Sequence, residues 1–440
     1  MSRILTASLS AAAIFLLSSS ANFAQAAPHL ARSAPAASGD AALEAAWQKY
    51  YVTLKKVHDD ILNSEQYKRF KGQRSMAYYS LLEAQAIAYN FAMAPQLASP
   101  RIYRATSWQT EMYTLGGNSA DFQYGTVFLD GKLTYRLTGK MNDSAVLLAQ
   151  WSGSLPGTNA YTPPISYDFS RFKTGKDGSF EVTLSAKPVK GNWIKLDPNA
   201  RYQWILFRPM TGKWDAKPAE LKIERVSDVD LNAYRAREIS PETVADRIDF
   251  AADFVRFMVD QWNIDYYRRM RANAGGVNKL NTLALNVAGD VGSPAAQYLQ
   301  GVYNVNDDEA LIVEMDGPPG GAFWTIQLFD SWLKSIDFRT RQSSLSMDQA
   351  VRDADGKYRF VISRRDPGVA NWLDTGGVED GMLLIRNYRT QQMAKPPTIT
   401  RVKFAQLANY LPKDTAKVSP TQRAEDIRKR DEAHLRRLKE

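Results

Sequence analysis

One stretch of sequence occurs twice in this chain, and this repetition constrains the fold more than any single motif does. Each copy holds an Asp-Gly turn, then an Asn-Trp pair, then an Arg at the end of an apolar run. The shared residues are Asp177, Asn192, Trp193 and Arg208 in the first copy, and Asp355, Asn371, Trp372 and Arg386 in the second. Self-similarity over such a long period indicates one supersecondary unit that is used twice.

Both copies alternate apolar and polar residues between turn residues, which is typical of antiparallel strands. In the first copy, Asp130-Gly131 separates two such runs and predicts a tight hairpin. The stretch from Gly153 to Arg171 contains three prolines and is expected to be a long loop. We therefore expect an α+β protein with two related antiparallel β-sandwich units, jelly-roll-like in form, and with an N-terminal helical region and a central helix.

The central helix has clear end signals. Ser240-Pro241 supplies an N-cap followed by Pro at the first helical position, and Gly275-Gly276 ends the helix. The expected order along the chain is a signal peptide (1–26), a flexible leader (27–40), a helical region (41–106), the first β unit (107–230), a helical connector (240–290), the second β unit (291–412) and a charged helical tail (413–440). Because the tail is rich in charge, we expect it to be solvated.

The first residues resemble an export signal. Arg3 supplies the positive charge, Ile4 to Leu17 is apolar and small, and Ala24-Gln25-Ala26 fits a cleavage site. The apolar run is too short to remain as a membrane span, and we expect no integral membrane segment elsewhere. The sequence thus predicts a periplasmic or secreted protein whose mature chain begins near Ala27, after cleavage near Ala26.

Composition excludes several kinds of site. The chain has no Cys and only three His residues, at positions 29, 58 and 434. A thiolate site or a multi-histidine zinc centre is therefore excluded, and a Ser-His-Asp triad is disfavoured. We expect no metal and no cofactor. The net charge of +9 is spread along the chain without a nucleic-acid motif, so we expect no nucleic-acid partner, and we keep a peripheral contact with the cell envelope as an alternative.

The candidate catalytic residues are carboxylates, namely Asp308, Glu309 and Asp366. Paired carboxylates can act as general acid and base on a glycan or an ester. Neighbouring residues of a strand face opposite sides, however, so Asp307-Asp308-Glu309 cannot converge unless the chain turns there. We favour a polar turn that leads into a strand.

The candidate ligand-binding residues belong to the repeated pattern and its flank: Trp372, Arg386, Arg365 and Asn371 in the second copy, and Trp193 and Arg208 in the first. A Trp can stack on a sugar or an aromatic ring, and an Arg can pair with a carboxylate on a ligand. Alternatively, the Trp fills the sandwich core and the Arg caps loop carbonyls. We favour this structural interpretation because both copies keep the set. Function is then expected where the copies differ, at Arg364 to Gly368 and Asp307 to Glu309.

The second copy resembles a known family, the domain of unknown function 1214. The resemblance is carried by Asp307-Asp308-Glu309-Ala310-Leu311, Phe323-Trp324-Thr325-Ile326-Gln327-Leu328, Asp355-Gly356, Asp366-Pro367-Gly368, Asn371-Trp372-Leu373 and Arg386. It implies β-rich sandwich domains in bacterial, often exported, proteins, and it implies no agreed activity. The N-terminal half resembles more weakly the companion domain of unknown function 1254.

Together these features predict an exported, non-catalytic protein that binds a small apolar, aromatic or carbohydrate ligand. The abundance of Trp and Tyr and the scarcity of His favour this function. Two alternatives stay open: a carboxylate-based hydrolase or lyase acting on a glycan or ester, and a cell-envelope assembly or interaction protein. The sequence leaves the oligomeric state open.

Overall fold

The structure, a computed structural model, describes residues 39–104, 113–154, 164–200, 202–283, 295–317, 321–390 and 392–439. The predicted signal peptide (1–26) and nearly all of the predicted leader (27–40) lie outside the described residues, because the first helix begins at Gly39.

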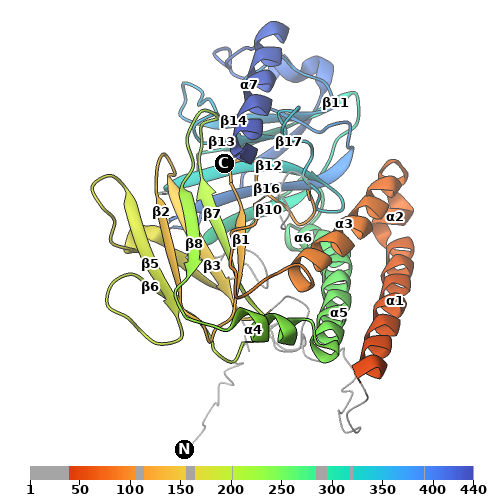
Figure 1. Ribbon diagram of the computed structural model, residues 1–440. Helices are drawn as coiled ribbons and strands as arrows, with labels where there is room; N and C mark the ends of the chain where they lie inside the picture. Colours follow the sequence, from red (N-terminus) through yellow and green to blue (C-terminus); the bar gives the residue numbers. More distant parts are fainter. Residues whose placement is uncertain are drawn as a thin grey trace, which may run out of the picture. The chain divides into compact units, whose positions relative to one another are not determined.

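Helices occupy the N-terminal region, the centre and the C-terminal end of the described chain (Figure 1). They are α1 (Gly39–Asn63), α2 (Glu65–Arg69), η1 (Lys71–Gln73), α3 (Arg74–Ala92), η2 (Phe169–Arg171), α4 (Leu231–Glu238), α5 (Pro241–Arg256), the π-helical η3 (Phe257–Asp265), α6 (Tyr266–Asn273), η4 (Phe404–Asn409) and α7 (Pro420–Lys439).

The strands fall into two groups, one on each side of the central helices in sequence. The first group is β1 (Gly125–Leu129), β2 (Tyr135–Lys140), β3 (Val146–Ser152), β4 (Ile165–Asp168), β5 (Ser179–Ser185), β6 (Trp193–Lys195), β7 (Gln203–Met210) and β8 (Glu220–Arg225). The second group is β9 (Asn281–Leu283), β10 (Ala296–Asn304), β11 (Glu309–Met315), β12 (Phe323–Asp330), β13 (Ser344–Ser346), β14 (Tyr358–Ser363), β15 (Trp372–Asp374), β16 (Asp380–Tyr388) and β17 (Thr398–Lys403).

The two groups build the same pair of sheets. In the first unit the strand orders are β1-β7-β3-β4 and β6-β5-β2-β8. In the second they are β10-β16-β12-β13, with β9 added beside β10, and β15-β14-β11-β17. β10 to β17 therefore take the places of β1 to β8 one for one. Even the exception to antiparallel pairing recurs, since β5 pairs with β6 and β14 with β15 in parallel.

Each unit has its own sandwich core, because alternate residues of the facing sheets point inward. Ile205 and Phe207 of β7 lie in the first core, and Leu383 and Ile385 of β16 lie in the second. With the helical N-terminal region and the central helix, this arrangement confirms the predicted α+β class. The stretch expected to be a long loop contains β4, which pairs with β3.

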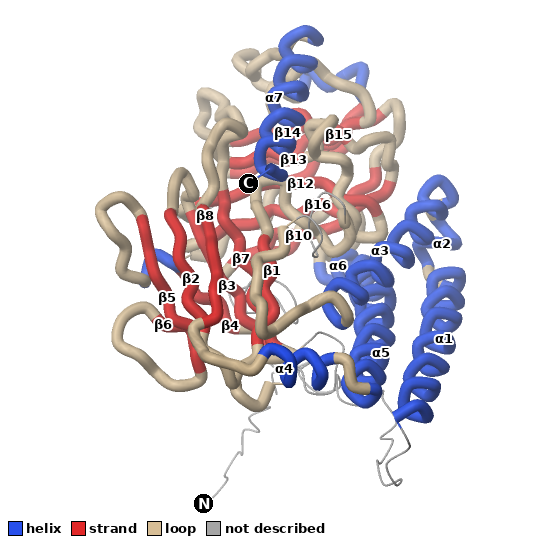
Figure 2. Tube along the Cα trace, in the orientation of Figure 1, coloured by secondary structure: helices blue, strands red, loops and turns tan. Residues whose placement is uncertain are grey.

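The central helix begins and ends at the predicted residues. The Ser240 Oγ accepts a hydrogen bond from the Thr243 N–H at 3.3 Å, and Gly275 and Gly276 follow α6 with positive φ angles of 72° and 128°. Between α5 and α6 the helix widens into the π-helical η3, a form that is rare and occurs mostly within α-helices. α1 lies alongside α5 in both views (Figures 1 and 2).

A third apolar cluster joins the helices to both β units. Phe91 of α3 contacts Phe128, Trp204 and Phe254, with ring centroids 5.0 to 5.2 Å apart. Phe122, just before β1, lies 5.5 Å from Tyr388 of the second unit. Each unit thus buries one further sheet face, outside its own core. In β7 and β16 the side chains that point away from the sandwich core lie on this face.

The C-terminal helix is not the solvated tail that its charge suggested. One face of α7 is buried, and it includes Arg423, Arg430, Ala433, His434 and Arg437. These arginines bond to backbone carbonyls of both β units, so the charged residues that implied solvation instead attach the helix. The prediction that this segment is solvated, which was based on its charge alone, is therefore wrong.

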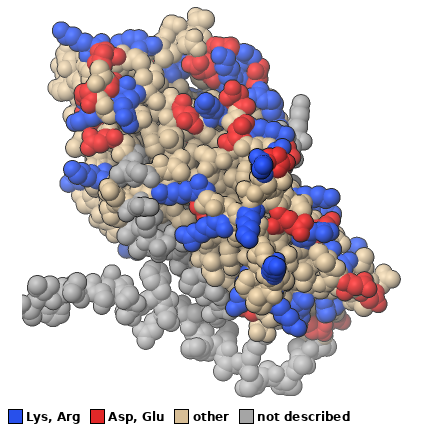
Figure 3. Space-filling view, turned by 90° about the vertical axis from the view of Figure 1, so that its left-hand side faces the viewer, with Lys and Arg blue, Asp and Glu red and all other residues tan. Residues whose placement is uncertain are grey.

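The described surface mixes both signs of charge. On the face drawn in Figure 3, Lys and Arg alternate with Asp and Glu, and neither sign covers the face alone. Among the described residues, no helix combines the length and the apolar character needed to cross a bilayer.

One buried carboxyl of the helical region gives a prediction about stability and pH. Burial and the nearby Asp60 raise the pKa of Asp260, in η3, to about 6, from 3.8. The folded chain therefore favours the protonated form, and this stability is present below pH 4 and is lost as the pH rises through 6. Asp260→Asn is expected to raise the free energy of unfolding by about 2 to 3 kcal/mol at pH 7.5 and to leave it unchanged at pH 4.

Urea denaturation at the two pH values measures this difference. Asp59→Asn on α1 is the matched control, because the Asp59 side chain is 48% exposed and pairs only with exposed or half-exposed residues, so that the unfolding transition is expected to stay where it is at either pH. Equal effects of Asp260→Asn at both pH values would contradict the assignment.

Candidate functional site: a buried arginine pair between the two β units

The two arginines of the repeated pattern lie on the sheet faces that the units bury outside their own cores. Arg208 follows Trp204 and Leu206 at two-residue steps along β7, and Arg386 follows Met382 and Leu384 along β16. Only 3% of Arg208 and 4% of Arg386 is exposed. Since β7 and β16 occupy equivalent positions, each unit contributes one arginine to the same buried region.

Arg208 makes few polar contacts for a buried guanidinium group. Its Nη1 donates to the Oε1 of Gln150 on the neighbouring strand β3 at 2.5 Å. Its Cζ lies 5.9 Å from the centroid of the Tyr124 ring. Extending the β1–β7 register by one residue beyond the Gly125–Phe207 pair places Tyr124 directly beside Arg208.

Arg386 is similarly placed in the second unit. Its cross-strand neighbour on β10 is Tyr298, and its Cζ lies 5.3 Å from the Phe329 ring centroid. Its Nη2 donates to the carbonyl of Gly117, in the segment that leads into β1. Its Nη1 is buried and has no hydrogen-bond partner within the described part of the chain.

Both guanidinium groups act on the same two tyrosines. Burial raises the pKa of Tyr124 and of Tyr388, and the positive charges of Arg386 and Arg208 oppose this shift at each ring. The phenols consequently stay neutral at physiological pH and cannot balance the arginine charges. The hydroxyl of Tyr124 accepts a hydrogen bond from the Ser119 N–H at 3.1 Å.

Among the described residues, Arg208 and Arg386 form hydrogen bonds with Gln150 and with the Gly117 carbonyl, and neither forms an ion pair with a carboxylate. A buried charge without a partner is costly, and buried arginines are normally paired with carboxylates. Arg359 illustrates the usual arrangement, since it bonds to Asp353 at 2.7 Å and Asp355 at 2.6 Å. The arginine pair is therefore an uncompensated positive site with hydrogen-bond donors, and it is suited to an anion.

The repeated Asn-Trp pair lies elsewhere and has matching contacts in both copies. The Trp372 Nε1 donates to the Ser363 carbonyl at 3.2 Å, as the Trp193 Nε1 donates to the Ser185 carbonyl at 3.1 Å. Asn371 accepts from and donates to the backbone of Val351. Asn192 does the same with Lys173. These contacts hold short strands and loops together.

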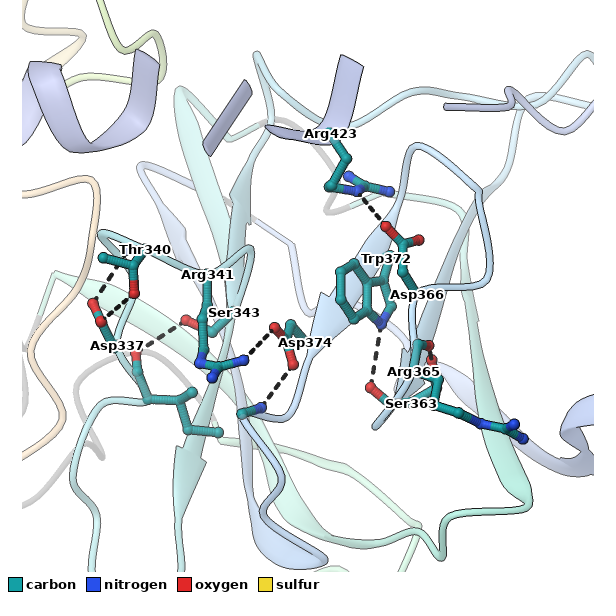
Figure 4. A network of polar contacts seen from close by, with 12 residues as sticks. Asp337, Thr340, Arg341, Ser343, Ser363, Arg365, Asp366, Trp372, Asp374 and Arg423 are labelled. Atoms are coloured by element: carbon teal, nitrogen blue, oxygen red, sulfur yellow. Dashed lines mark hydrogen bonds and ion pairs between the residues drawn. The ribbon is translucent and has the colours of Figure 1, made fainter. Parts of the chain in front are cut away.

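Trp372 lies neither in the sandwich core nor against the arginine pair. It is 6% exposed and packs in a small cluster on the outer face of its sheet, with Val361 and Val369. Figure 4 shows its ring beneath Arg423, whose Cζ lies 5.3 Å from the ring centroid. The structure thus separates Trp372 from Arg386.

The remaining predicted residues are partnered at the surface. Asp366 pairs with Arg423 at 2.9 Å, and Arg365 lies over the Phe404 ring at 4.4 Å. Asp308 pairs with Lys403 at 2.7 Å, and this contact holds the pKa of Asp308 below its usual range.

Glu309 begins β11 after the polar turn that we expected at this place. Its carboxylate accepts a hydrogen bond from the Asn306 N–H at 3.2 Å and lies 3.5 Å from Arg401. The three candidate acids are therefore engaged in local contacts rather than gathered around one cleft. In the part of the chain that the structure describes, no group of His, Asp and Glu is arranged to hold a metal ion.

The tyrosines around the arginine pair were not among the predicted site residues. Tyr124 and Tyr298 occupy equivalent positions beside the two arginines, at the first strand of each unit. An alignment of the two units would have shown a Tyr at this position in both. Only the sheet register, however, places Tyr124 beside Arg208 and Tyr298 beside Arg386. Tyr388 is two residues beyond Arg386 and shares its face.

Residues 304–392 match the family model described as Protein of unknown function (DUF1214). This match lies in the second β unit and confirms the resemblance predicted there. The weaker resemblance of the N-terminal half to the companion domain stays a prediction. No curated protein matches the chain.

Among solved structures, the chain is similar to an uncharacterised protein from Burkholderia cenocepacia. The two share 26% sequence identity with a TM-score of 0.73, over 83% of this chain and 99% of the other. A protein from Vibrio parahaemolyticus is similar at 12% identity and a TM-score of 0.45, over 74% of this chain and 98% of the other. Neither name states an activity, so the functional argument depends on the site.

The absence of a carboxylate partner predicts an unusual response to mutation. In buffer without phosphate or organic anions, Arg386→Met is expected to change the free energy of unfolding by no more than about 1 kcal/mol, because it removes an uncompensated charge. Arg359→Met, the control, leaves the buried Asp353 unpaired and is expected to cost about 3 to 5 kcal/mol. Urea denaturation measures both, and equal losses would show that Arg386 is a structural cation.

Proposed function

We propose that this protein is an exported, non-catalytic binding protein for a small ligand that carries an anionic group on an apolar or aromatic body. The anionic group would lie between Arg208 and Arg386. The observation that carries the proposal is the pair of buried guanidinium groups, one from each β unit, without a carboxylate partner among the described residues.

The surroundings of the pair support this ligand class. Guanidinium groups bond to carboxylates and phosphates in a geometrically specific way, most strongly where water is excluded. Tyr124 lies beside Arg208 and Phe329 beside Arg386, and Phe122 packs against Tyr124. These aromatic rings favour an apolar or ring-shaped body. A sugar acid or an aromatic acid has both parts. A neutral sugar or hydrocarbon has no group that would balance the charge.

The carboxylate-based hydrolase is less well supported. A glycosidase needs two carboxylates about 5 to 10 Å apart across a cleft. Asp308 and Asp366 are instead held in ion pairs with Lys403 and Arg423. These ion pairs are what a structural role of the carboxylates predicts, so we favour binding without catalysis over hydrolysis.

The proposal that the protein is exported depends on its first residues. The positive Arg3, the apolar run from Ile4 to Leu17 and the Ala24-Gln25-Ala26 sequence support a cleaved signal peptide. The absence of Cys is compatible with any redox environment.

We also propose that the two β units arose by duplication, which their common strand order and the matching contacts of Asn192 and Asn371 support.

A thermal-shift screen tests the ligand class. The panel contains benzoate, a hexuronate and inorganic phosphate, with benzamide and the parent hexose as neutral counterparts. A ligand at 100 times its Kd stabilises the folded state by about 2.7 kcal/mol, so a clear rise in Tm is expected for one or more anions and for neither neutral counterpart.

Variants connect the shift to the site. Arg208→Gln and Arg386→Gln are each expected to abolish the rise in Tm, because each removes one of the two positive charges. Arg365→Gln, at an exposed arginine over Phe404, is the control and is expected to keep it. Neutral compounds that work as well as their anions, or full shifts in both arginine variants, would refute the proposed site.

Export is tested by expressing the full chain in a Gram-negative host and fractionating the cells. The mature protein is expected in the periplasmic extract or the medium, with Ala27 as its first residue by N-terminal sequencing. Replacing Leu16 and Leu17 by Arg is the control, since it interrupts the apolar run and should retain the uncleaved chain in the cytoplasm. Cytoplasmic retention of the unaltered chain would rule out export.

A further inference from the structure

Among the described side chains of the C-terminal helix α7, arginines rather than aliphatic residues make most of its attachments. Arg423, Arg430 and Arg437 recur every seven residues and lie on its buried face, together with Ala433 and with His434, whose ring packs against Trp214 and Phe338. A helix held by an apolar stripe, such as α5 with Phe250 and Phe254, separates only when the core opens. A helix held by hydrogen bonds to carbonyls can detach at lower cost.

The arginines of α7 attach to both β units. Arg430 donates to the carbonyl of Ser344 at 2.8 Å, in the strand β13 that Figure 1 shows next to α7. Arg437 donates to the hydroxyl of Thr211 at 2.9 Å and to the carbonyl of Ala120 at 3.4 Å, both in the first unit. Arg430 and Arg437 also lie over the Trp214 ring, at 4.5 and 5.4 Å from its centroid. α7 therefore bridges the two units.

The segment 117–124 connects α7 to the arginine pair. At its centre, Ala120 accepts a hydrogen bond from Arg437, and the buried Asp121 is acted on by the charges of Arg430 and Arg437. At its ends, Gly117 accepts a hydrogen bond from Arg386, and Tyr124 lies beside Arg208. One short stretch of backbone thus has α7 on one side and the candidate anion site on the other.

Asp121 also fixes this segment to the second unit. Its carboxylate accepts hydrogen bonds from the Thr325 hydroxyl at 2.5 Å and the Gln349 amide at 3.2 Å. Thr325 is the cross-strand neighbour of Arg386 on β12. Removing the α7 arginines would therefore leave a buried carboxylate without its nearest positive charges, beside the strand that carries Arg386.

We propose that α7 is a strap that regulates the arginine pair: when docked, it holds segment 117–124 against Arg386 and Arg208, and when released, it frees this segment and weakens anion binding. This inference rests on the proposed function, because it assigns a control element to the same site. Preorganisation is the physical basis, since ordering the segment beforehand lowers the cost of binding.

Hydrogen exchange of the ligand-free full chain tests the coupling independently of any ligand. In the double variant Arg430→Gln/Arg437→Gln, amides of α7 and of segment 117–124 are expected to exchange about tenfold faster, while those of β2 and β5 keep their rates. Arg428→Gln is the matched control, because Arg428 bonds only to Glu425 and Glu432 within α7 in the described structure. Faster exchange of α7 without a change in 117–124 would overturn the proposal.

Binding of benzoate, measured by titration calorimetry, tests the regulation. The double variant is expected to bind benzoate about tenfold more weakly than the unaltered chain and than Arg428→Gln. Unchanged affinity despite faster exchange of 117–124 would reduce α7 to a structural element and overturn the inference.

The two proposals can fail separately. If the unaltered chain binds none of benzoate, the hexuronate and phosphate, the proposed function fails, and the exchange experiment still decides whether α7 holds segment 117–124. If the double variant does not fold, as judged by near-UV circular dichroism, the single variant Arg437→Gln replaces it, with the same expectations at smaller amplitude.

Discussion

The structure depends on the fact that, in each β unit, the sheet that contains β7 or β16 buries both of its faces rather than one. A sandwich needs only its inner faces to be apolar, and β7 and β16 supply these through Ile205, Phe207, Leu383 and Ile385. Their other alternate residues are buried too, against the helices and the opposite unit. This second burial removes Arg208 and Arg386 from water. The same interface that stabilises the assembly thereby creates an uncompensated positive site.

The local elements could be predicted from the sequence because their signals are local. The Ser240-Pro241 start and the Gly275-Gly276 end of the central helix follow from capping chemistry. The polar turn before Glu309 follows from strand periodicity. The strand β4 was missed because prolines on its N-terminal side resemble a loop signal, whereas its pairing with β3 is a tertiary contact.

The environment of α7 could not be predicted, because composition does not reveal what a charged side chain meets. Arg423, Arg430 and Arg437 would be solvated on an isolated helix. In the fold they meet backbone carbonyls left free at the ends of strands and turns, together with the rings of Trp214 and Trp372. A spacing of seven residues was visible in the sequence, but it indicates one helical face and not the partner of that face.

The repeated pattern contains two sets of residues with different roles. Asn371 and Trp372 make the same backbone contacts as Asn192 and Trp193, which a structural role explains within each unit separately. The arginines differ, because Arg386 acts on Tyr124 of the first unit and Arg208 acts on Tyr388 of the second, and neither unit alone provides these interactions. Conservation of a residue in both copies therefore does not by itself mark it as structural. Where two copies pack against each other, the residue that both keep can form one site from two halves, and the contact between the copies decides which residues do so.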